Sequence, residues 1–569
     1  MLKKILSLIL IVLCMSACTT TASFPSKDQN NTNNAEDEIN EFEGFYEIED
    51  GLYVNYLPGI YDYETEIEFK FKDEESKLYY TLDFSYPDAS IGNLYTDPIY
   101  LAEPVVEKYT EYPLTASVDA ILSWDAGGKC VSNYYIDNIQ KPKKYHLLGK
   151  QNVITIRYID ASGIEKVRTL SYIYGDYSIP VVSLSMPFEN WFGSQGLYNN
   201  IRTEYEKRGY FEYFDSTNNE SFFVNTQVKL GGNWSVGYPQ RTLNLNFNKD
   251  ETGLSQTEVV ANIFPGRKTN DGFETLNSFS RLRLHNAGNC FENWTGFNDA
   301  ILQNMMTDTN VATTAYRPCV AFLNGEYWGI YYIREHYKPD YFKTHYGVKK
   351  SGVAIYDYKG GFVFNDGNIS DFNSFFNKID AYLNKDFTKD SVYEEFIDKY
   401  IDVDSLIDVF IAHSFGGNWD FVGNYNNLKA WRTTYIDPNN PYADGKLRFC
   451  LHDADFVFTD YNNFLDKNSP NSYYGFKIFE KLTKNQQFKD LFYSRAEELI
   501  STNLSYEYSS QILQQMVDEV EPYKLDAMKR WGNPDSISVW KQKVSDADRF
   551  LKWKSRSYLD ILRNTLQTY

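Results

Sequence analysis

The chain has 569 residues, with 77 acidic residues against 56 Lys and Arg, so its formal net charge is -21. This excess of acid argues against a broad nucleic-acid-binding surface, which needs clustered positive charge. Apolar residues make up 43% of the chain, which indicates folded domains rather than disorder, and the length suggests several domains.

The first segment is typical of an export signal. Residues 1–4 are short and basic, and the apolar run at residues 5–13 is too short to span a bilayer. Small residues then lead into Cys18, a pattern that resembles a bacterial lipoprotein signal in which the cysteine is lipidated. Plain cleavage beside an incidental cysteine is the alternative. We therefore predict a signal peptide over residues 1–17 and a membrane-anchored lipoprotein on the extracytoplasmic face.

Residues 18–44 are rich in Asn and acidic residues and hold too little apolar area to fold. We expect a flexible tether there. Cys14 lies in the predicted signal and Cys18 is the predicted lipidation site, so four cysteines remain. Export permits three disulfide pairings among them, which the sequence leaves open. They are Cys130, Cys290, Cys319 and Cys450. None lies in a CxxC pair, so we expect no structural zinc site and treat them as buried thiols.

Residues 45–177 contain short strand patterns separated by turn residues. Residues 67–71 alternate strictly between apolar and charged side chains, and residues 153–158 are β-branched and nearly alternating. Residues 118–122 are a less regular candidate. These patterns predict a small β-sandwich.

Two further stretches of this region, residues 78–87 and 94–99, resemble the chitobiase C-terminal-like, fibronectin-III-associated sandwich of secreted bacterial proteins. That resemblance implies a spacer with at most weak glycan contact. The usual Asp-Gly turn of such domains is here Asp83-Phe84.

From residue 178 onward strand and helix patterns mix. Residues 298–306 have helical spacing, residues 322–332 read as a hairpin with an Asn-Gly turn, and a helix opens near Asp404. Residues 488–500, 512–520 and 546–562 are amphipathic and predict C-terminal helices.

Carboxylates are the strongest chemical candidates, since the chain has no nucleophile elbow, HExxH motif or Walker loop. Asp420 and Asn424 follow the predicted helix, and Asp453 and Asp455 follow an apolar strand. If extended, that strand end would place Asp453 and Asp455 on one side. Acids with an amide oxygen suit Mg²⁺, and the order Asp, Asn, then Asp parallels protein kinases.

Several motifs in one order resemble the CotH spore-coat kinase family. They are residues 231–232, 239–243, 282–289, 298–300, 324–335, 417–424 and 453–455, and the likeness runs from about residue 179 to 569. The resemblance implies an atypical protein-kinase-like fold that uses ATP and Mg²⁺ or Mn²⁺ to phosphorylate Ser or Thr of proteins on the cell or spore surface. The predicted fold class is therefore multidomain, with an all-β sandwich followed by an α+β kinase-like domain, residues 178–569, that ends in helices.

The resemblance also assigns roles residue by residue. Asp420 matches the first essential acid, and Asp453 matches the metal-binding acid. Asn424 and Asp455 are further candidate metal ligands, although Asp455 could instead cap its loop.

Three residues are candidate nucleotide contacts through the same resemblance. Arg241 stands where the family usually has Lys, which changes the geometry of phosphate contact. Arg283 is a second phosphate candidate. Glu335 is expected to hold a phosphate-contacting basic residue in place, or else to form a buried structural ion pair. Cys290 stands where the family usually has Asp.

Two other functions remain open on the sequence. One is a nonenzymatic surface or coat-assembly scaffold, which would show no Mg²⁺-dependent ATP binding. The other is a metal-dependent glycosyltransferase, with Asp453-Ala454-Asp455 as a DxD motif. No early βαβ nucleotide-binding unit accompanies that motif.

Overall fold

The computed structural model describes residues 22–23, 42–82, 85–87, 89–102, 151–200, 205–233, 235–238, 240–248, 252, 257–291, 295–531 and 536–569. The predicted signal peptide, Cys18, Cys130, the candidate strand at residues 118–122 and the turn at Asp83-Phe84 lie outside these residues, as does most of the predicted tether. Within the described residues no helix is both long and apolar enough to cross a membrane.

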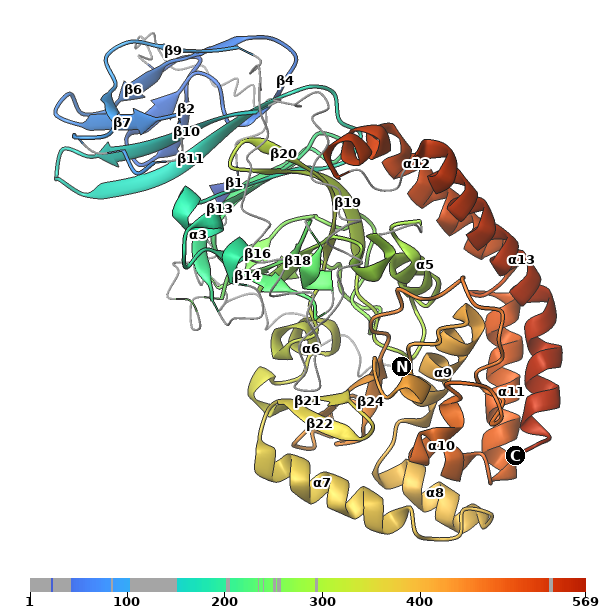
Figure 1. Ribbon diagram of the computed structural model, residues 1–569. Coiled ribbons are helices and arrows are strands. Elements are labelled where there is room, and N and C mark those ends of the chain that lie inside the picture. The colour runs from blue at the N-terminus through green and yellow to red at the C-terminus, as the bar shows by residue number, and fades with distance from the viewer. Residues whose placement is uncertain are drawn as a thin grey trace, which may run out of the picture.

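The N-terminal region is built from strands, which lie at the upper left of Figure 1. They are β2 (Tyr46–Glu49), β3 (Leu52–Val54), β4 (Gly59–Tyr61), β5 (Thr65–Ile67), β6 (Phe69–Phe71), β7 (Lys77–Thr81), β8 (Asn93–Leu94), β9 (Ile99–Leu101), β10 (Gln151–Ile159) and β11 (Glu165–Tyr174). A five-stranded sheet, in the order β4-β11-β10-β7-β8, accompanies the smaller sheets β2-β3-β6 and β5-β9. Their apolar faces share one core, which includes Leu52, Phe69, Ile154 and Tyr172.

The strictly alternating residues 67–71 do not form one strand. The chain divides at Glu68, so that β5 pairs with β9 whereas β6 pairs with β3. Asn55 causes the division, because its side-chain Oδ1 accepts the Glu68 amide at 2.9 Å and its own amide donates to the Glu68 carbonyl at 3.1 Å. Residues 153–158 do lie in one strand, β10, as predicted.

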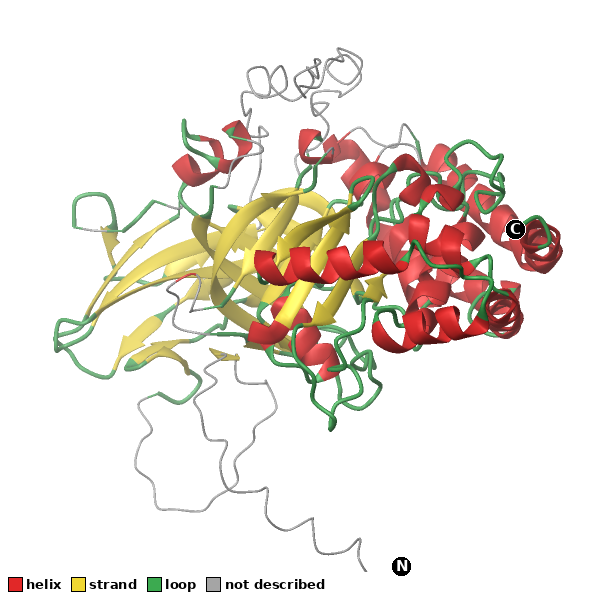
Figure 2. Ribbon diagram, turned by 90° about the horizontal axis from the view of Figure 1, so that it is seen from below, coloured by secondary structure: helices red, strands yellow, loops and turns green. Residues whose placement is uncertain are grey.

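A second, larger sheet occupies the middle of the chain and closes on itself (Figure 2). Its strands are β1 (Ala22–Ser23), β12 (Val181–Ser185), β13 (Lys207–Asp215), β14 (Glu220–Gly231), β15 (Thr242–Asn246), β18 (Arg281–His285), β19 (Tyr316–Leu323) and β20 (Glu326–Arg334). The order is β1-β14-β13-β12-β19-β20-β18-β15, and the pairing of β14 with β15 closes the ring. The hairpin turn between β19 and β20 has positive φ at Asn324 and Gly325, which confirms the predicted Asn-Gly turn.

Most of the remaining elements form a mixed region that ends in helices, at the bottom and right of Figure 1, whereas the short elements at residues 188–192 and 259–260 lie beside the closed sheet. The helices are α3 (Phe188–Phe192), α5 (Asn298–Met305), α6 (Pro339–Tyr346), α7 (Ile369–Tyr382), α8 (Asp390–Lys399), α9 (Val403–Gly416), α10 (Lys477–Leu482), α11 (Gln486–Ser501), α12 (Tyr506–Trp531) and α13 (Ile537–Leu566). The strands are β16 (Val259–Val260), β17 (Ser278–Phe279), β21 (Val353–Tyr358), β22 (Phe362–Asp366), β23 (Lys429–Thr433) and β24 (Arg448–Cys450), and the last four form a sheet in the order β22-β21-β23-β24. Short 3₁₀ turns include η2 (Ser235–Gly237), η3 (Gly288–Phe291) and η5 (Val422–Asn424).

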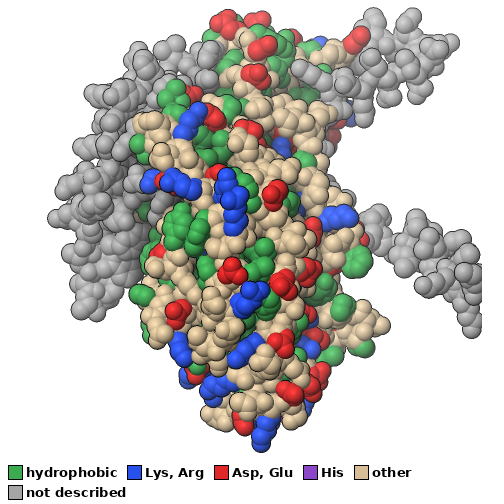
Figure 3. Space-filling model, turned by 90° about the vertical axis from the view of Figure 1, so that its right-hand side faces the viewer, with side chains coloured by type: hydrophobic (Ala, Val, Ile, Leu, Met, Phe, Trp, Pro, Cys, Tyr) green, Lys and Arg blue, Asp and Glu red, His purple; other side chains and the backbone are tan. Residues whose placement is uncertain are grey.

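The predicted helices are all present, and the C-terminal ones are longer than their sequence patterns. Helix α12 continues to Trp531, whose Nε1 donates to the Trp328 carbonyl at 2.8 Å. The Arg530 guanidinium lies between the same two indole rings, 4.6 Å and 4.4 Å from their centroids. This contact ties the end of α12 to the β19–β20 hairpin. The face on which α12 and α13 lie shows Lys, Arg, Asp and Glu interspersed (Figure 3).

The boundary predicted at residue 178 separates two sheets that are nevertheless in contact. An apolar cluster joins Ile173 of β11 and Tyr177 to Val181, Phe214 and Val320 of the closed sheet. The N-terminal region therefore packs on the closed sheet through a core of its own.

A buried carboxylate lies beside that cluster. Glu212 of β13 accepts hydrogen bonds from the amide (3.1 Å) and the hydroxyl of Ser171, and the Ser171 hydroxyl also lies 2.9 Å from Ser183 Oγ. Burial raises the pKa of Glu212 to about 7, although the bonds from Ser171 and the nearby Arg168 charge act in the opposite direction.

The raised pKa of Glu212 predicts that the stability of the protein depends on pH. Because its folded pKa of about 7 exceeds the ordinary 4.5, its stabilising contribution is complete below pH 4.5 and is lost as the pH rises through 7. Glu212→Gln should remove that loss, which amounts to up to about 3 kcal/mol. We expect the free energy of unfolding of the variant, relative to wild type, to increase between about pH 5 and pH 8. Glu497→Gln, at an exposed position, is the control; the same pH trend in both variants would contradict the assignment.

Candidate functional site

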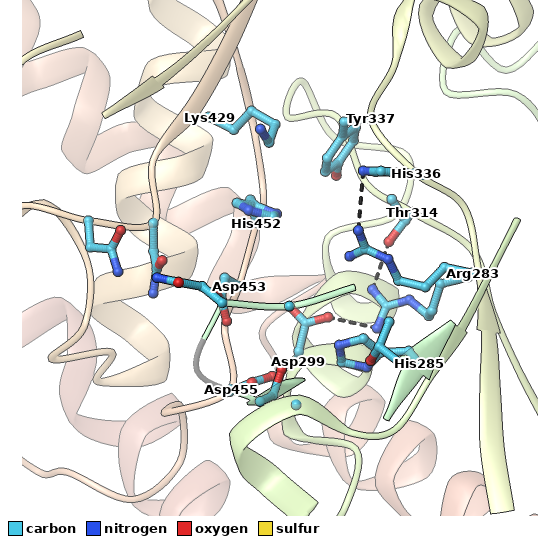
Figure 4. A pocket seen from close by; sticks show the side chains of 18 of the residues that line it. Arg283, His285, Asp299, Thr314, His336, Tyr337, Lys429, His452, Asp453 and Asp455 are labelled. Atoms are coloured by element: carbon cyan, nitrogen blue, oxygen red, sulfur yellow. Dashed lines mark hydrogen bonds and ion pairs between the residues drawn. The ribbon is translucent and has the colours of Figure 1, made fainter. Parts of the chain in front are cut away.

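A cavity of about 430 Å³ lies between the closed sheet and the mixed region (Figure 4). One wall comes from the β14–β15 turn, β18 and the end of β20, and carries Gly232, Arg283 and Arg334. The other wall comes from the loop after α9, from β23 and from the loop after β24, and carries Asp420, Lys429 and Asp453. Segments far apart in the chain thus bring acids and cations into one space.

Asp453 and Asp455 both line this cavity, but not for the reason that the sequence suggested. Asp453 has a φ of 53°, so the backbone there is left-handed rather than extended. The Asp455 carboxylate accepts the Asn289 amide at 2.7 Å. A Cβ on Gly288 would lie 2.1 Å from the same carboxylate oxygen, and the φ of Gly288 is +56°. Only glycine therefore lets η3 approach Asp455 so closely.

These acids are under strong electrostatic strain. Burial, reinforced by the carboxylates of Asp299 and Asp420, raises the pKa of Asp453 to about 7. Burial and the Asp453 charge raise the pKa of Asp455 well above its ordinary value. Burial also raises the pKa of Asp420. A divalent cation would relieve this repulsion, so the donor set fits Mg²⁺ or Mn²⁺.

The described residues contain no group of three His, Cys, Asp or Glu side chains placed to hold a metal ion by themselves. Mg²⁺ can bind through one or two carboxylates, with waters and substrate phosphates completing its shell. Asp453 and Asp455 are the residues that would hold it.

Two asparagines fix the Asp420 carboxylate. Asn424 Nδ2 donates to one carboxylate oxygen at 2.6 Å, and Asn427 Nδ2 donates to the other at 3.0 Å. Asn427 also lines the cavity, whereas Asn424, the sequence candidate, is exposed and does not. Residues 424–427 hold three asparagines and one tyrosine, and Asn427 differs from the other two asparagines in being buried and in having a left-handed backbone.

Two arginines stand directly opposite each other on neighbouring strands. Arg283 of β18 and Arg334 of β20 are cross-strand partners. Arg334 has an acidic partner, whereas Arg283 donates to the neutral Asn244 Oδ1 at 2.8 Å and lies 3.2 Å from His336 Nε2. Burial and the Arg334 charge lower the pKa of Arg283 to about 10. Like charges placed in this way repel each other, so an anion bound beside Arg283 would be favourable.

Asp299 of α5 is the acidic partner of Arg334, at 2.7 Å. Its other oxygen accepts the Ala454 amide at 2.9 Å. Burial alone would raise the pKa of Asp299, but Arg334 and the Ala454 amide outweigh burial and hold it at about 2. Asp299 was not a candidate in the sequence, although residues 298–300 belonged to a motif. Asp299 lies between Arg334 and the loop at residues 453–455, and only the tertiary structure brings these parts together.

Lys429 was also missed. It is buried on β23, forms an ion pair with Asp357 of β21, and lines the cavity. A lysine within the otherwise apolar residues 428–431 was the available signal. His285 and His452 line the cavity as well, and burial together with the neighbouring cations lowers the pKa of each to about 3, so both are neutral at pH 7.

The structure places the other two predicted nucleotide contacts differently. Arg241 does not border the cavity: its guanidinium donates to the Tyr198 carbonyl at 2.7 Å and lies 4.5 Å from the Tyr198 ring centroid. Glu335 does border it, but its carboxylate accepts the Ala315 amide at 3.0 Å and lies 2.7 Å from His345 Nε2. The acids that hold basic residues of the cavity are Asp299, which pairs with Arg334, and Asp357, which pairs with Lys429.

The described cysteines are free and buried. Cys319 and Cys450 lie in strands β19 and β24, and Cys290 donates its thiol to the Asp455 carbonyl at 2.9 Å. Cys290 therefore contacts the backbone of the loop at residues 453–455. It stands at the position where the resemblance expects an acid.

A family model described as CotH kinase protein matches residues 228–558. The match covers more than half of the chain, and it begins in β14 and ends in α13, so it spans both walls of the cavity. The chain belongs to the CotH kinase family. A search of curated proteins finds no match.

The two opposed arginines predict opposite effects on stability. Arg283→Gln should keep the free energy of unfolding or raise it by up to about 1 kcal/mol, because it removes a like-charge repulsion. Arg334→Gln should lower it by about 3 kcal/mol or more, because it leaves the buried Asp299 without its partner. Both should weaken binding of a phosphate-bearing ligand such as ATP by at least about tenfold. Urea unfolding and calorimetric titration check this, and equal destabilisation by both variants would make Arg283 a structural residue.

Proposed function

We propose that this chain is an extracytoplasmic, lipid-anchored protein kinase that transfers the γ-phosphate of ATP to Ser or Thr of proteins on the cell or spore surface, with a divalent metal ion. The observation that supports this most directly is the meeting of Arg283, Asp420 and Asp453 at one cavity. The family match supports a kinase in general terms.

The parts of the cavity resemble those of protein kinases. There, a Gly-rich loop covers the phosphates, a basic residue pairs with an acid of a helix, and a catalytic Asp and an Asn precede a metal-binding Asp. Here the corresponding parts are the β14–β15 turn with Gly231 and Gly232, the pair of Arg334 on β20 with Asp299 on α5, Asp420 with Asn427, and Asp453. The pair differs in using Arg and Asp, and its acid precedes its base in the chain.

Each group has a distinct role in this proposal. Arg283 and Lys429 bind and orient the phosphate oxygens, since both border the cavity. Asp420, held by its two asparagines, orients the acceptor hydroxyl and takes its proton. A bound Mg²⁺ would neutralise charge on the β- and γ-phosphates, and Asp453 and Asp455 would hold it.

Substitution of the acids tests the proposal. Asp420→Ala and Asp453→Ala should each lower transfer of labelled γ-phosphate to a generic acceptor by at least about 10²-fold. Asp453→Ala should also weaken Mg²⁺-dependent ATP binding, whereas Asp420→Ala should leave more of that binding intact. Both variants should stay folded, because each removes a carboxylate from a repulsive group.

Asp398→Ala, on the exposed face of α8, is the matched control and should transfer phosphate as wild type does. Near wild-type rates in both site variants would mean that the acids are misassigned. A wild-type protein that neither binds ATP with Mg²⁺ nor transfers phosphate would favour the scaffold function.

The anchor has its own test. If Cys18 carries lipid, two acyl chains on it give stable membrane attachment, whereas one chain binds marginally. Cys18→Ala should therefore release the protein into the medium, which fractionation and immunoblotting detect. Retention of the variant in the membrane fraction would contradict lipid anchoring at this residue.

A further inference from the structure

A second cavity, of about 970 Å³, adjoins the catalytic one and shares Arg283, His336 and Lys429 with it. We call it the trough. Its upper wall is made by β14, β15 and β18, and its lower wall by residues 336–339, 350–353 and 365–368. It contains none of Asp420, Asp453 and Asp455. The trough therefore lies away from the group that activates the acceptor, on the side where the untransferred part of the donor belongs.

The upper wall of the trough is polar because side chains alternate between the two faces of a strand. Leu243, Leu282 and Leu284 face the interior of the closed sheet, where each is fully buried. The alternate positions carry amides and cations into the trough. They are Gln227, Lys229, Asn244, Asn246, Arg281 and Arg283.

The side chains that border the trough are mostly polar. Of its apolar residues, Leu230 and Pro339 are partly exposed, whereas Leu245, Tyr337 and Val353 have exposed fractions of 1%, 4% and 2%. Ligand pockets for a base commonly rely on apolar and aromatic lining. The polar side chains of the trough suit a ligand that carries many polar groups.

The charge of the lining indicates the sign of that ligand. Six basic side chains border the trough, namely Lys229, Arg281, Arg283, Lys338, Lys350 and Lys429, against the acids Glu206 and Asp366. Asp340 lies beside the trough and forms ion pairs with two of these cations, Arg281 at 2.6 Å and Lys350 at 2.8 Å. Lys338 reaches Asp366 only at 3.4 Å. Lys429 is paired with Asp357, so six cations stand against four acids at or beside the trough. This local excess of positive charge, in a chain whose net charge is -21, attracts a polyanion.

We propose that the trough binds a chain of phosphate groups, so that inorganic polyphosphate serves as a phosphoryl donor in addition to ATP. This rests on the phosphoryl transfer proposed above. The terminal phosphate lies in the catalytic cavity and the rest of the chain extends over the cations of the trough.

The transfer step is balanced without a further reactant. The acceptor hydroxyl oxygen forms a bond to the terminal phosphorus, and the bond from that phosphorus to the bridging oxygen breaks. The bridging oxygen keeps the electron pair and leaves on a polyphosphate one unit shorter. The hydroxyl proton passes to the Asp420 carboxylate.

The first experiment compares donors with the full chain. Labelled polyphosphate and γ-labelled ATP are each supplied with Mg²⁺ and a generic protein acceptor, and each unlabelled donor is used to compete with the other. We expect transfer from both donors and mutual competition. Transfer from ATP with no transfer from polyphosphate overturns the inference, whether or not polyphosphate competes, and leaves the proposed kinase function standing. Transfer from neither overturns both.

The second experiment locates the polyphosphate site. Lys229→Gln combined with Lys338→Gln changes both walls of the trough and leaves the catalytic cavity unaltered. In this variant we expect kcat/KM for polyphosphate to fall at least about tenfold more than kcat/KM for ATP. As the salt concentration rises, kcat/KM for polyphosphate should decrease more steeply in wild type than in the variant. An equal loss for both donors overturns the assignment to the trough.

A matched double variant controls for the loss of two lysine charges. Lys385, in the turn after α7, and Lys541, on α13, are exposed and pair with Glu395 and Glu521. Lys385→Gln combined with Lys541→Gln should leave the ratio of the two kcat/KM values at its wild-type level. A change in that ratio equal to the change in the trough variant would show a general charge effect and overturn the assignment.

Discussion

The Asp299 carboxylate joins the two halves of the site, and the rest of the cavity depends on it. One oxygen holds Arg334 of the closed sheet, and the other holds the Ala454 amide between the two metal-candidate acids. Because this carboxylate is buried, both bonds are made in a medium of low dielectric, where an unpaired partner would be costly. Helix α5 therefore sets the distance between the cation-bearing wall and the acid-bearing wall of the cavity.

The site concentrates like charges that folding alone would not favour. Arg283 faces Arg334 across two strands, and Asp453 lies close enough to Asp420 and Asp299 for their charges to raise its pKa. A phosphate bound beside the arginines and a divalent cation bound beside the carboxylates would relieve these two repulsions. Local electrostatic conflict of this kind is typical of functional sites, where stability is given up for binding and catalysis.

Long-range packing holds these walls in register. The end of α12 fixes the β19–β20 hairpin through Arg530 and Trp531, and β20, the second strand of that hairpin, carries Arg334. On the other side, Glu212 and the apolar cluster around Ile173 attach the N-terminal strands to the closed sheet. The N-terminal region is thus a packed neighbour of the kinase-family region, with a buried polar contact at Glu212.

The sequence by itself determined the elements whose signals are local. Helical spacing predicted α5 and α9, the Asn-Gly pair predicted the β19–β20 turn, and acids after an apolar strand pointed to Asp453 and Asp455. Only the tertiary structure decided which polar residues meet. It joined Asp299 to Arg334, brought Lys429 to the cavity, placed Arg241 among backbone carbonyls, and divided one alternating run at Glu68 through the Asn55 side chain. These outcomes depend on contacts between residues far apart in the chain, and neither periodicity nor spacing contains that information.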